Sequence, residues 1–157
     1  ILEAAVKSEV KFFINTGTTW QFYDEDNSNP TNLYAATKNA FQEIAKYYVA
    51  ISELYFVNLL LNDTYGANDT RKKIFNLWKN LKDGETLNMS PGNQIFDALH
   101  IDDVVNAFKM LLNQISNDNE KKYLLKNFSV SNQQKMSLKE VANLFQKIAS
   151  KKINIIR

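Results

Sequence analysis

The sequence contains no cysteine and a single histidine, His100, among its 157 residues. The absence of cysteine excludes disulfides, thiolate metal sites and cysteine nucleophiles, and one histidine leaves an ordinary zinc site short of ligands. Arginine is also scarce, because only Arg71 and Arg157 accompany the lysines in a chain whose net charge is +2. Nucleic-acid binders commonly grip phosphates with arginines, so we expect no nucleic-acid partner.

Long apolar runs and clustered glycines are missing as well. No run approaches the roughly 18–20 apolar residues of a membrane-spanning helix, and the N-terminus lacks a charged-then-apolar signal pattern. We therefore expect an intracellular, cytoplasmic protein without membrane contact. The four glycines (17, 66, 84 and 92) stand far apart. The chain thus has no Gly-rich turn of the kind that holds a dinucleotide pyrophosphate.

The remaining composition is that of a globular domain, with 45% apolar and 23% charged residues. The apolar runs Val10–Thr16 and Leu54–Leu61 predict strands buried on both faces, as in a parallel sheet. Residues 17–31 and 63–69 are polar and predict loops. The other predicted elements are helices over 1–8, 32–52, 70–82, 102–114 and 137–150, and short strands over 86–89, 94–100, 123–130 and 152–156. This alternation predicts an α/β fold with parallel pairing.

Local signals support the helix starts. Thr31 or Asn32 follows Pro30 and is a plausible N-cap for the helix over 32–52. The segment Ser137-Leu-Lys-Glu140 matches a capping box. Asp102 and Asp103 stand where the positive end of a helix favours carboxylates.

Polar residues follow two of the predicted strands. In an open parallel sheet, ligands sit beyond the carboxyl ends of the strands. Between the two strands lies a helix that begins near Tyr34, and Lys38 shares its face four residues later. A free phenol has a pKa of about 10, but a nearby ammonium stabilises the phenolate. With a hydroxyl such as that of Thr16, these groups would form an acid/base device for carbonyl and alcohol interconversion.

A Tyr-x-x-x-Lys pair occurs in many helices by chance, and a threonine cluster is more often a turn than a site. It is the joint spacing of the two, in a strand–loop–helix context, that favours a functional interpretation. His100 with Asp97, Asp102 and Asp103 also suggests metal ligands. We favour a strand-end histidine beside a helix N-terminus with its usual carboxylates, and predict no metal site.

Four blocks, in order and approximate spacing, resemble a known family. They are Phe13–Trp20 (FINTGTTW), Asn32–Lys38 (NLYAATK), Asn62–Gly66 (NDTYG) and Asp97–Val105 (DALHIDDVV). The chain resembles the extended short-chain dehydrogenase/reductases, and more narrowly the NAD-dependent epimerase/dehydratase group that acts on nucleotide sugars. The phrase NTGTTW, with DTYG and SPGNQ (Ser90–Gln94), is most similar to reductases that make CDP-linked dideoxyhexoses.

The resemblance implies roles for individual residues. Tyr34 matches the catalytic acid/base, Lys38 the lysine that binds the nicotinamide ribose, and Thr16 the hydroxyl that bonds the substrate oxygen. The cofactor would be NAD or NADP, and the substrate a nucleotide sugar. Further implied residues are Asn62 and Thr64 for the cofactor, with Tyr34 and Lys38, and Thr18, Asp63, Arg71, Leu87, Asn88, Met89 and Ser90 for the substrate.

The sequence also departs from the family's pattern. Phe96 stands where many members carry a diphosphate-binding arginine, for which Arg71 could substitute. Gly17 and Thr18 replace the acidic pair common in dehydratases, which favours a reductase or epimerase. The family opens with a Gly-rich turn that this chain lacks, so we expect a fragment of a longer enzyme that by itself binds the cofactor weakly or not at all.

The resemblance further implies a Rossmann-like sheet, of which this chain is the C-terminal half. Residues 1–66 would belong to it and residues 67–157 mainly to a substrate-binding lobe, with short segments returning to the sheet. The helix that carries Tyr34 and Lys38 would form a homodimer interface. The alternative hypothesis is a non-catalytic remnant or assembly partner that uses the helix Tyr34–Ser52 for packing.

Overall fold

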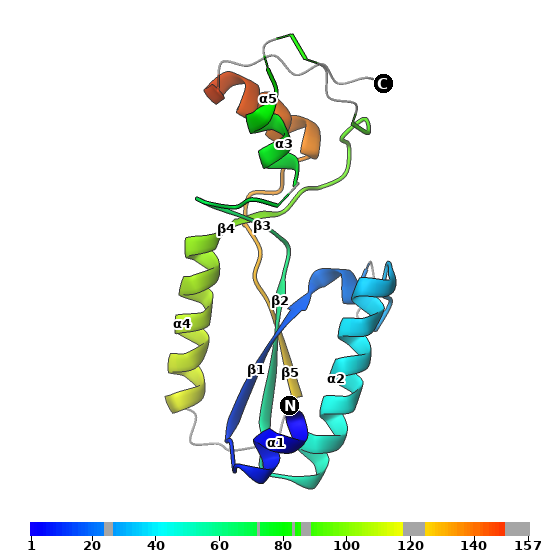
Figure 1. The fold of residues 1–157 in the computed structure, drawn as a ribbon, viewed down its shortest axis with the longest axis vertical. Helices are drawn as coiled ribbons and strands as arrows, with labels where there is room; N and C mark the ends of the chain where they lie inside the picture. The colour runs from blue at the N-terminus through cyan, green and yellow to red at the C-terminus, as the bar shows by residue number, and fades with distance from the viewer. Residues whose placement is uncertain (24–26, 72, 83, 86–88, 118–124, 150–157) are drawn as a thin grey trace. The chain divides into compact units, whose positions relative to one another are not determined.

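The computed structural model describes residues 1–23, 27–71, 73–82, 84–85, 89–117 and 125–149 (Figure 1). The chain divides into two compact units. The first, here called the sheet unit, comprises residues 1–62 and 102–131, and the second unit comprises residues 63–101 and 132–157. Each is described by itself below. Within the described ranges, no helix is both long and apolar enough to cross a membrane.

The sheet unit contains three parallel strands in the order β1-β2-β5, which confirms the predicted α/β class. The strands are β1 (Phe12–Thr18), β2 (Tyr55–Leu61) and β5 (Leu125–Ser129). Phe12 pairs with Tyr55 at the start of β1, and Thr18 pairs with Leu61 at its end. The carboxyl ends of β1 and β2 therefore coincide.

Helices cover both faces of this sheet (Figure 1). The helices α1 (Leu2–Lys7) and α2 (Leu33–Ile51) lie on one face, and α4 (Ile101–Asn117) lies on the other. Phe56 and Val57, neighbours on β2, are both fully buried and belong to the two opposite apolar clusters. This alternation is what a two-sided apolar strand predicts, and it confirms the prediction for β2.

The same prediction is confirmed only in part for β1, whose Phe13 and Ile14 pack partly buried against the two opposite clusters. Phe12 is 40% exposed, and Thr16 is exposed as well. Among the described residues, β1 has one strand neighbour, β2, and lies at an edge of the sheet. An apolar run in the sequence predicts that a strand packs against helices, but it does not predict how many strands lie beside it.

The chain between β1 and α2 is more ordered than the predicted loop over 17–31. Strand β1 continues through Gly17 to Thr18 and is followed by a 3₁₀ turn, η1 (Thr19–Gln21). At Gly17 a Cβ would lie 2.6 Å from Asn58 Oδ1 and 2.7 Å from Leu60 Cδ2. Any side chain here would force these buried neighbours to shift. Gly17, predicted as a loop residue, is therefore a strand residue in close contact with its neighbours.

The N-cap predicted for α2 is confirmed. Asn32 has extended backbone geometry, and its Oδ1 accepts a hydrogen bond of 2.9 Å from the Ala35 amide. This bond satisfies one of the free N–H groups of the first turn. The cap fixes where the helix begins, and therefore where Tyr34 lies.

The second unit contains a short parallel pair, β3 (Asp63–Tyr65) with β4 (Ala98–His100), and two helices, α3 (Ile74–Asn80) and α5 (Leu138–Ala149). Residues 63–65, predicted as loop, are thus a strand, and α3 is shorter than predicted. The apolar core here is built around Trp78, with Leu138 and Ala142. The predicted strand over 152–156 and most of that over 86–89 lie outside the described residues.

The capping box predicted at α5 is confirmed. The Glu140 amide donates to Ser137 Oγ at 3.2 Å, and the Ser137 amide donates to Glu140 Oε2 at 2.7 Å. The Ser137 amide, and with it the Ser137 hydroxyl, donates to the Glu140 carboxylate and holds its pKa below the usual value. Helix α4 begins one residue before its predicted start and ends at Asn117, with Asp102 and Asp103 in its first turn.

Candidate functional site

The carboxyl end of β1 and the first turns of α2 bring three of the predicted residues together. Tyr34 lies in the first turn of α2, directly after the Asn32 cap. Lys38, one turn later on the same face, has its Nζ 5.8 Å from the centroid of the Tyr34 ring. The same Nζ donates a hydrogen bond of 2.7 Å to the carbonyl oxygen of Thr16.

These groups are open to solvent. Tyr34 is 55% exposed, and Thr16 is also exposed. A phenol hydroxyl, an ammonium beside its ring and an exposed threonine at one strand end are the parts of a proton-transfer device. Groups of this kind are the ones that exchange protons with a substrate oxygen in proteins.

Thr18, the last residue of β1, and Thr19, directly after it, both make hydrogen bonds within this unit. Thr18 is 8% exposed, and its Oγ1 accepts a hydrogen bond of 3.4 Å from the Trp20 amide to cap η1. Thr19 Oγ1 donates to Asn62 Oδ1, which joins the segment after β1 to the end of β2. Asn62, a predicted cofactor residue, thus lies beside the strand end that carries Thr16.

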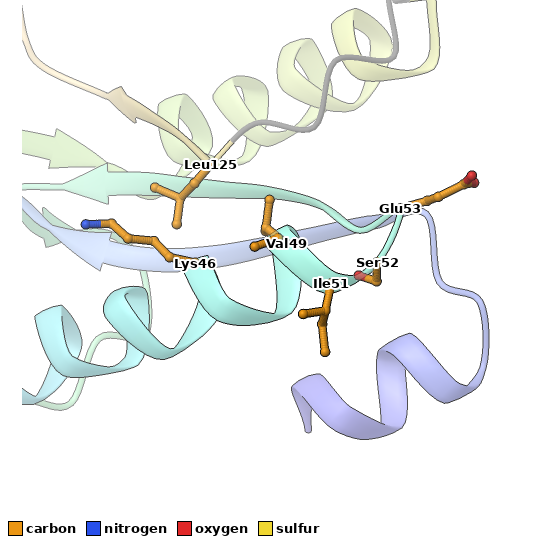
Figure 2. Close-up of a pocket in the computed structure, with 7 residues that line it drawn as sticks. Lys46, Val49, Ile51, Ser52, Glu53 and Leu125 are labelled. Atoms are coloured by element: carbon orange, nitrogen blue, oxygen red, sulfur yellow. The ribbon is translucent and has the colours of Figure 1, made fainter.

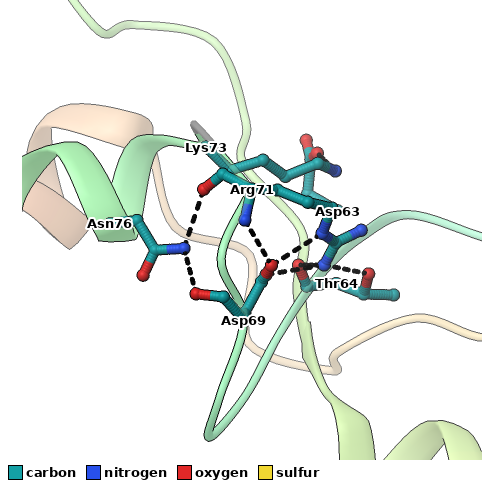
Figure 3. Close-up of polar contacts among 6 residues, drawn as sticks. All are labelled: Asp63, Thr64, Asp69, Arg71, Lys73 and Asn76. Atoms are coloured by element: carbon teal, nitrogen blue, oxygen red, sulfur yellow. Dashed lines mark hydrogen bonds and ion pairs between the residues drawn. The ribbon is translucent and has the colours of Figure 1, made fainter.

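The predicted residues of the second unit form a separate polar cluster (Figure 3). Arg71 Nε donates to Asp69 Oδ1 at 2.8 Å, and Arg71 Nη2 donates to Asp69 Oδ2 at 2.6 Å. Arg71 Nη2 also contacts the backbone oxygen of Thr64 at 3.0 Å. Lys73 pairs with Asp63 at 2.8 Å. The Lys73 amide donates to the Arg71 carbonyl oxygen at 2.8 Å, which connects Asp63, Thr64 and Arg71 in one hydrogen-bonded group.

Asp69 is the partner of Arg71 that the sequence analysis missed. The hydrogen bonds from Arg71 lower the pKa of the Asp69 carboxyl to about 2, and the same pairing raises the pKa of Arg71. The guanidinium predicted to grip a diphosphate is already engaged by a carboxylate. An aspartate two residues before an arginine was a signal in the sequence, but that spacing is too common to identify a pair.

Met89 and Ser90 differ from each other in their surroundings. Met89 packs against the apolar cluster around Trp78, whereas Ser90 Oγ accepts a hydrogen bond of 3.2 Å from Gln94 Nε2. The predicted substrate residues Leu87 and Asn88 lie outside the described residues.

His100 makes an edge contact with Tyr65, their ring centroids 5.2 Å apart. In the described part of the chain, no group of three or more His, Asp or Glu residues is placed to hold a metal ion.

The sheet unit also has a groove of about 670 Å³ at the C-terminal end of α2 (Figure 2). Val49, Ile51, Ser52 and Leu125 are among its lining residues. Leu125 is the first residue of β5, and Ser52 lies shortly before β2. The groove therefore lies at the amino ends of the parallel strands, opposite the ends that carry Thr16 and Asn62, and does not belong to the candidate site.

Comparison with known proteins places the fold among sugar-nucleotide enzymes. The chain has 34% identity over 109 residues with the CDP-abequose synthase of Yersinia pseudotuberculosis, covering 68% of this chain and 37% of that protein. Its structure matches the UDP-glucuronic acid 4-epimerase of Bacillus cereus in complex with NAD, with a TM-score of 0.80 and 20% identity. It also matches the dTDP-glucose 4,6-dehydratase of Bacillus anthracis in complex with NAD, with a TM-score of 0.81 and 18% identity.

The structural matches cover nearly all of this chain but only part of each relative. The two structures are matched over 99% of this chain, and over 53% and 52% of their own lengths. The chain thus spans about half of the solved structures that it matches. The family model for NAD dependent epimerases and dehydratases matches residues 1–125. Because that match covers most of the sequence and includes the strand–helix segment from Thr16 to Lys38, the chain belongs to the NAD-dependent epimerase/dehydratase family.

Proposed function

We propose that this chain is the catalytic portion of an NAD(P)-dependent nucleotide-sugar reductase or epimerase. The observation that carries the proposal is the joint position of Tyr34, Lys38 and Thr16 at the carboxyl end of β1. The identity to CDP-abequose synthase supports the reductase branch, with a CDP-linked keto sugar as the substrate class. Gly17 and Thr18 in place of an acidic pair also favour a reductase over a dehydratase.

In the proposed mechanism, the Tyr34 hydroxyl donates a proton to the substrate carbonyl oxygen as that carbon is reduced. The Thr16 hydroxyl donates a second hydrogen bond to the same oxygen and orients it. Lys38 stabilises the phenolate that remains on Tyr34, and the phenolate then recovers a proton from solvent. When bound, the nicotinamide cofactor supplies the hydride that reduces the carbon.

The residues of this chain fit one end of such a cofactor. Tyr34 and Lys38 present a hydroxyl and an ammonium that can hydrogen-bond the hydroxyls of the nicotinamide ribose, with Asn62 and Thr64 as further proposed contacts. The pyrophosphate end has no counterpart here, because none of the four glycines belongs to a Gly-rich turn. We therefore assign this chain the ribose end of the cofactor site only.

The second unit is proposed to bind the nucleotide part of the substrate, so that residues 1–66 carry the reacting groups and residues 67–157 mainly the substrate lobe. The proposed contacts are Asp63, Arg71, Leu87, Asn88, Met89 and Ser90, with Thr18 from the sheet unit. The pairing of Arg71 with Asp69 modifies its role. A diphosphate would have to compete with that carboxylate, or bind the guanidinium edge that Asp69 leaves open.

A homodimer through α2 is part of the proposal. Ile44, Tyr47 and Ile51 are 54–62% exposed and recur at three- and four-residue spacing along α2. Such a stripe of large apolar side chains on one helix face is suited to helix packing. The same stripe supports the alternative function, a non-catalytic assembly partner, in which packing through α2 would be the only activity.

A turnover assay distinguishes the proposed reductase from the non-catalytic assembly partner. The protein that carries this chain is incubated with NADPH or NADH and a CDP-linked 4-keto sugar, and cofactor oxidation is followed by absorbance. The reductase proposal expects oxidation that depends on the keto sugar and is lost on Tyr34→Phe. Dimerisation without such oxidation would instead favour the assembly partner.

A further inference from the structure

A buried chain of amide side chains joins β1, α2 and β2 in the sheet unit. Gln42 lies at its centre, because its Oε1 accepts hydrogen bonds from Gln21 Nε2 at 3.2 Å and from Asn58 Nδ2 at 2.7 Å. Asn58 Oδ1 accepts a bond of 2.8 Å from Asn15 Nδ2, and Gln21 Nε2 also reaches Asn39 Oδ1 at 3.3 Å. Gln21 and Asn58 are fully buried, and Gln42 is 4% exposed.

The network holds the strand segment that carries Thr16. Asn15, the residue before it, is bonded through its side chain to Asn58. Thr18, two residues after it, donates its backbone amide to Gln21 Oε1 at 3.0 Å. Thr16 therefore lies in a short stretch whose two sides are both tied to buried amides.

The helix that carries Tyr34 is tied to the same network. Gln42 follows Lys38 by four residues and Tyr34 by eight, so the three share one face of α2. The side-chain oxygen Oε1 of Gln42 thus joins the helix to β2 and, through Gln21, to the end of β1. A shift of α2 along or around its axis would stretch or bend these bonds.

A buried amide is a costly way to fill space. A buried amide without a partner destabilises the fold, whereas apolar side chains of this size would pack without that risk. Hydrogen bonds between amides depend on geometry, because such a bond weakens steeply when the donor–hydrogen–acceptor angle departs from linear. A bonded network therefore specifies one register between helix and strand, where apolar packing tolerates several.

We propose that Gln42 is a positioning residue for the reaction: it holds Tyr34 on α2 in register with Thr16 on β1. The inference rests on the proposed function, and Gln42 acts through those residues without touching the substrate. A misplacement of about 1 Å between reacting groups can cost on the order of 100-fold in rate, which is the size of effect at stake.

The kinetic test compares Gln42→Met with Val49→Ala in the protein that carries this chain. Val49 lies on the same helix, is 9% exposed and packs in the apolar cluster on the α2 face, so its truncation costs stability without touching the network. We expect Gln42→Met to lower kcat by about 10–100-fold, with KM for the nucleotide sugar changed less than about threefold. Val49→Ala should keep kcat within about threefold.

A conservative variant sharpens the kinetic test. Gln42→Glu keeps an oxygen that can accept hydrogen bonds from both Gln21 and Asn58. We expect the kcat of Gln42→Glu to be at least about tenfold higher than that of Gln42→Met. Equal losses of kcat in Gln42→Met and Val49→Ala, or a loss confined to KM, would overturn the proposal. Either result would mean that Gln42 contributes to stability or binding alone.

A second measurement does not depend on turnover. In ¹⁵N NMR spectra of the 157-residue chain, Gln42→Met should shift the Thr18 backbone amide and speed its hydrogen exchange, whereas Val49→Ala should leave both unchanged. An unaffected Thr18 amide contradicts the positioning proposal whatever the activity. If Thr18 responds as expected but the parent protein turns over no nucleotide sugar, the network still fixes the strand end, and the proposed function itself has failed.

Discussion

Lys38 on α2 donates a 2.7 Å hydrogen bond to the backbone carbonyl of Thr16 on β1. The bond joins the helix that carries the proposed acid/base to the strand that carries the proposed orienting hydroxyl. It places the ammonium between two groups that the chain separates by eighteen residues, Thr16 and Tyr34. Helix capping, strand register and this one bond together decide the geometry of the site.

The first prediction concerns Tyr34→Phe in the protein that carries this chain. The substitution removes the proposed proton donor and keeps the ring, so folding should be unchanged while turnover falls by about 10²–10⁴-fold. Tyr48→Phe makes the same chemical change further along α2 and serves as the control. Near-normal turnover of a nucleotide keto sugar by Tyr34→Phe would mean that another group supplies the proton.

The second prediction concerns Lys38→Met. Loss of the ammonium removes the positive charge beside the ring of the proposed acid/base and a proposed contact to the nicotinamide ribose, so turnover should fall. Loss of the bond to Thr16 should also loosen the contact between α2 and β1. The measurement is kcat and KM of the variant beside those of the parent, and an unchanged kcat would remove Lys38 from the proposed mechanism.

The third prediction concerns Gly17→Ala. A Cβ there would meet Asn58 Oδ1 at 2.6 Å and Gln21 Oε1 at 2.7 Å, so we expect a loss of about 1–3 kcal/mol in unfolding free energy together with a loss of turnover. Gly84→Ala is the matched comparison, since its Cβ meets nothing within 4 Å and its cost arises from a φ of +85°. That variant should lose stability but keep turnover. If both variants kept full activity, the close packing at Gly17 would not matter for the site.

The fourth prediction concerns acid stability. The Asp69 pKa of about 2 lies below its ordinary value of 3.8, so its pairing with Arg71 contributes stability above about pH 4. That contribution is lost as the pH falls from about 4 to about 2. Thermal melts of the parent and of Asp69→Asn should differ at neutral pH and converge near pH 2. In Arg71→Met, the NMR titration midpoint of Asp69 should rise towards 3.8.

The fifth prediction concerns self-association of the 157-residue chain. Strand β1 is an edge strand with Phe12 40% exposed, and unpaired edges with apolar side chains favour association. Light scattering should show species larger than a monomer. Phe12→Lys should reduce association through the edge, whereas Ile44→Asp should reduce only the proposed dimer through α2. A monomeric parent chain with a cooperative melt would contradict both surfaces.

Much of the fold could be predicted from the sequence because its signals are local. The apolar run of β2, the Asn32 cap and the Ser137–Glu140 box each depend on residues close together in the chain. The spacing of Tyr34 and Lys38 also needs only the helix period. For these features, periodicity and capping chemistry are sufficient.

Other features were decided by tertiary structure alone. Among the described residues, β1 lies at an edge of the sheet. This position depends on which strands pair with β1, and the residues of β1 do not predict it. The pairing of Arg71 with Asp69 and Thr64 depends on how the chain folds back after β3. The amide network joins Asn15, Gln42 and Asn58 across as many as 43 positions of sequence. Asparagine and glutamine are abundant throughout this chain, so residue type alone does not identify these members. Only the packing of α2 on β1 and β2 brings them together, because hydrogen bonds between their side chains offset the cost of burying amides.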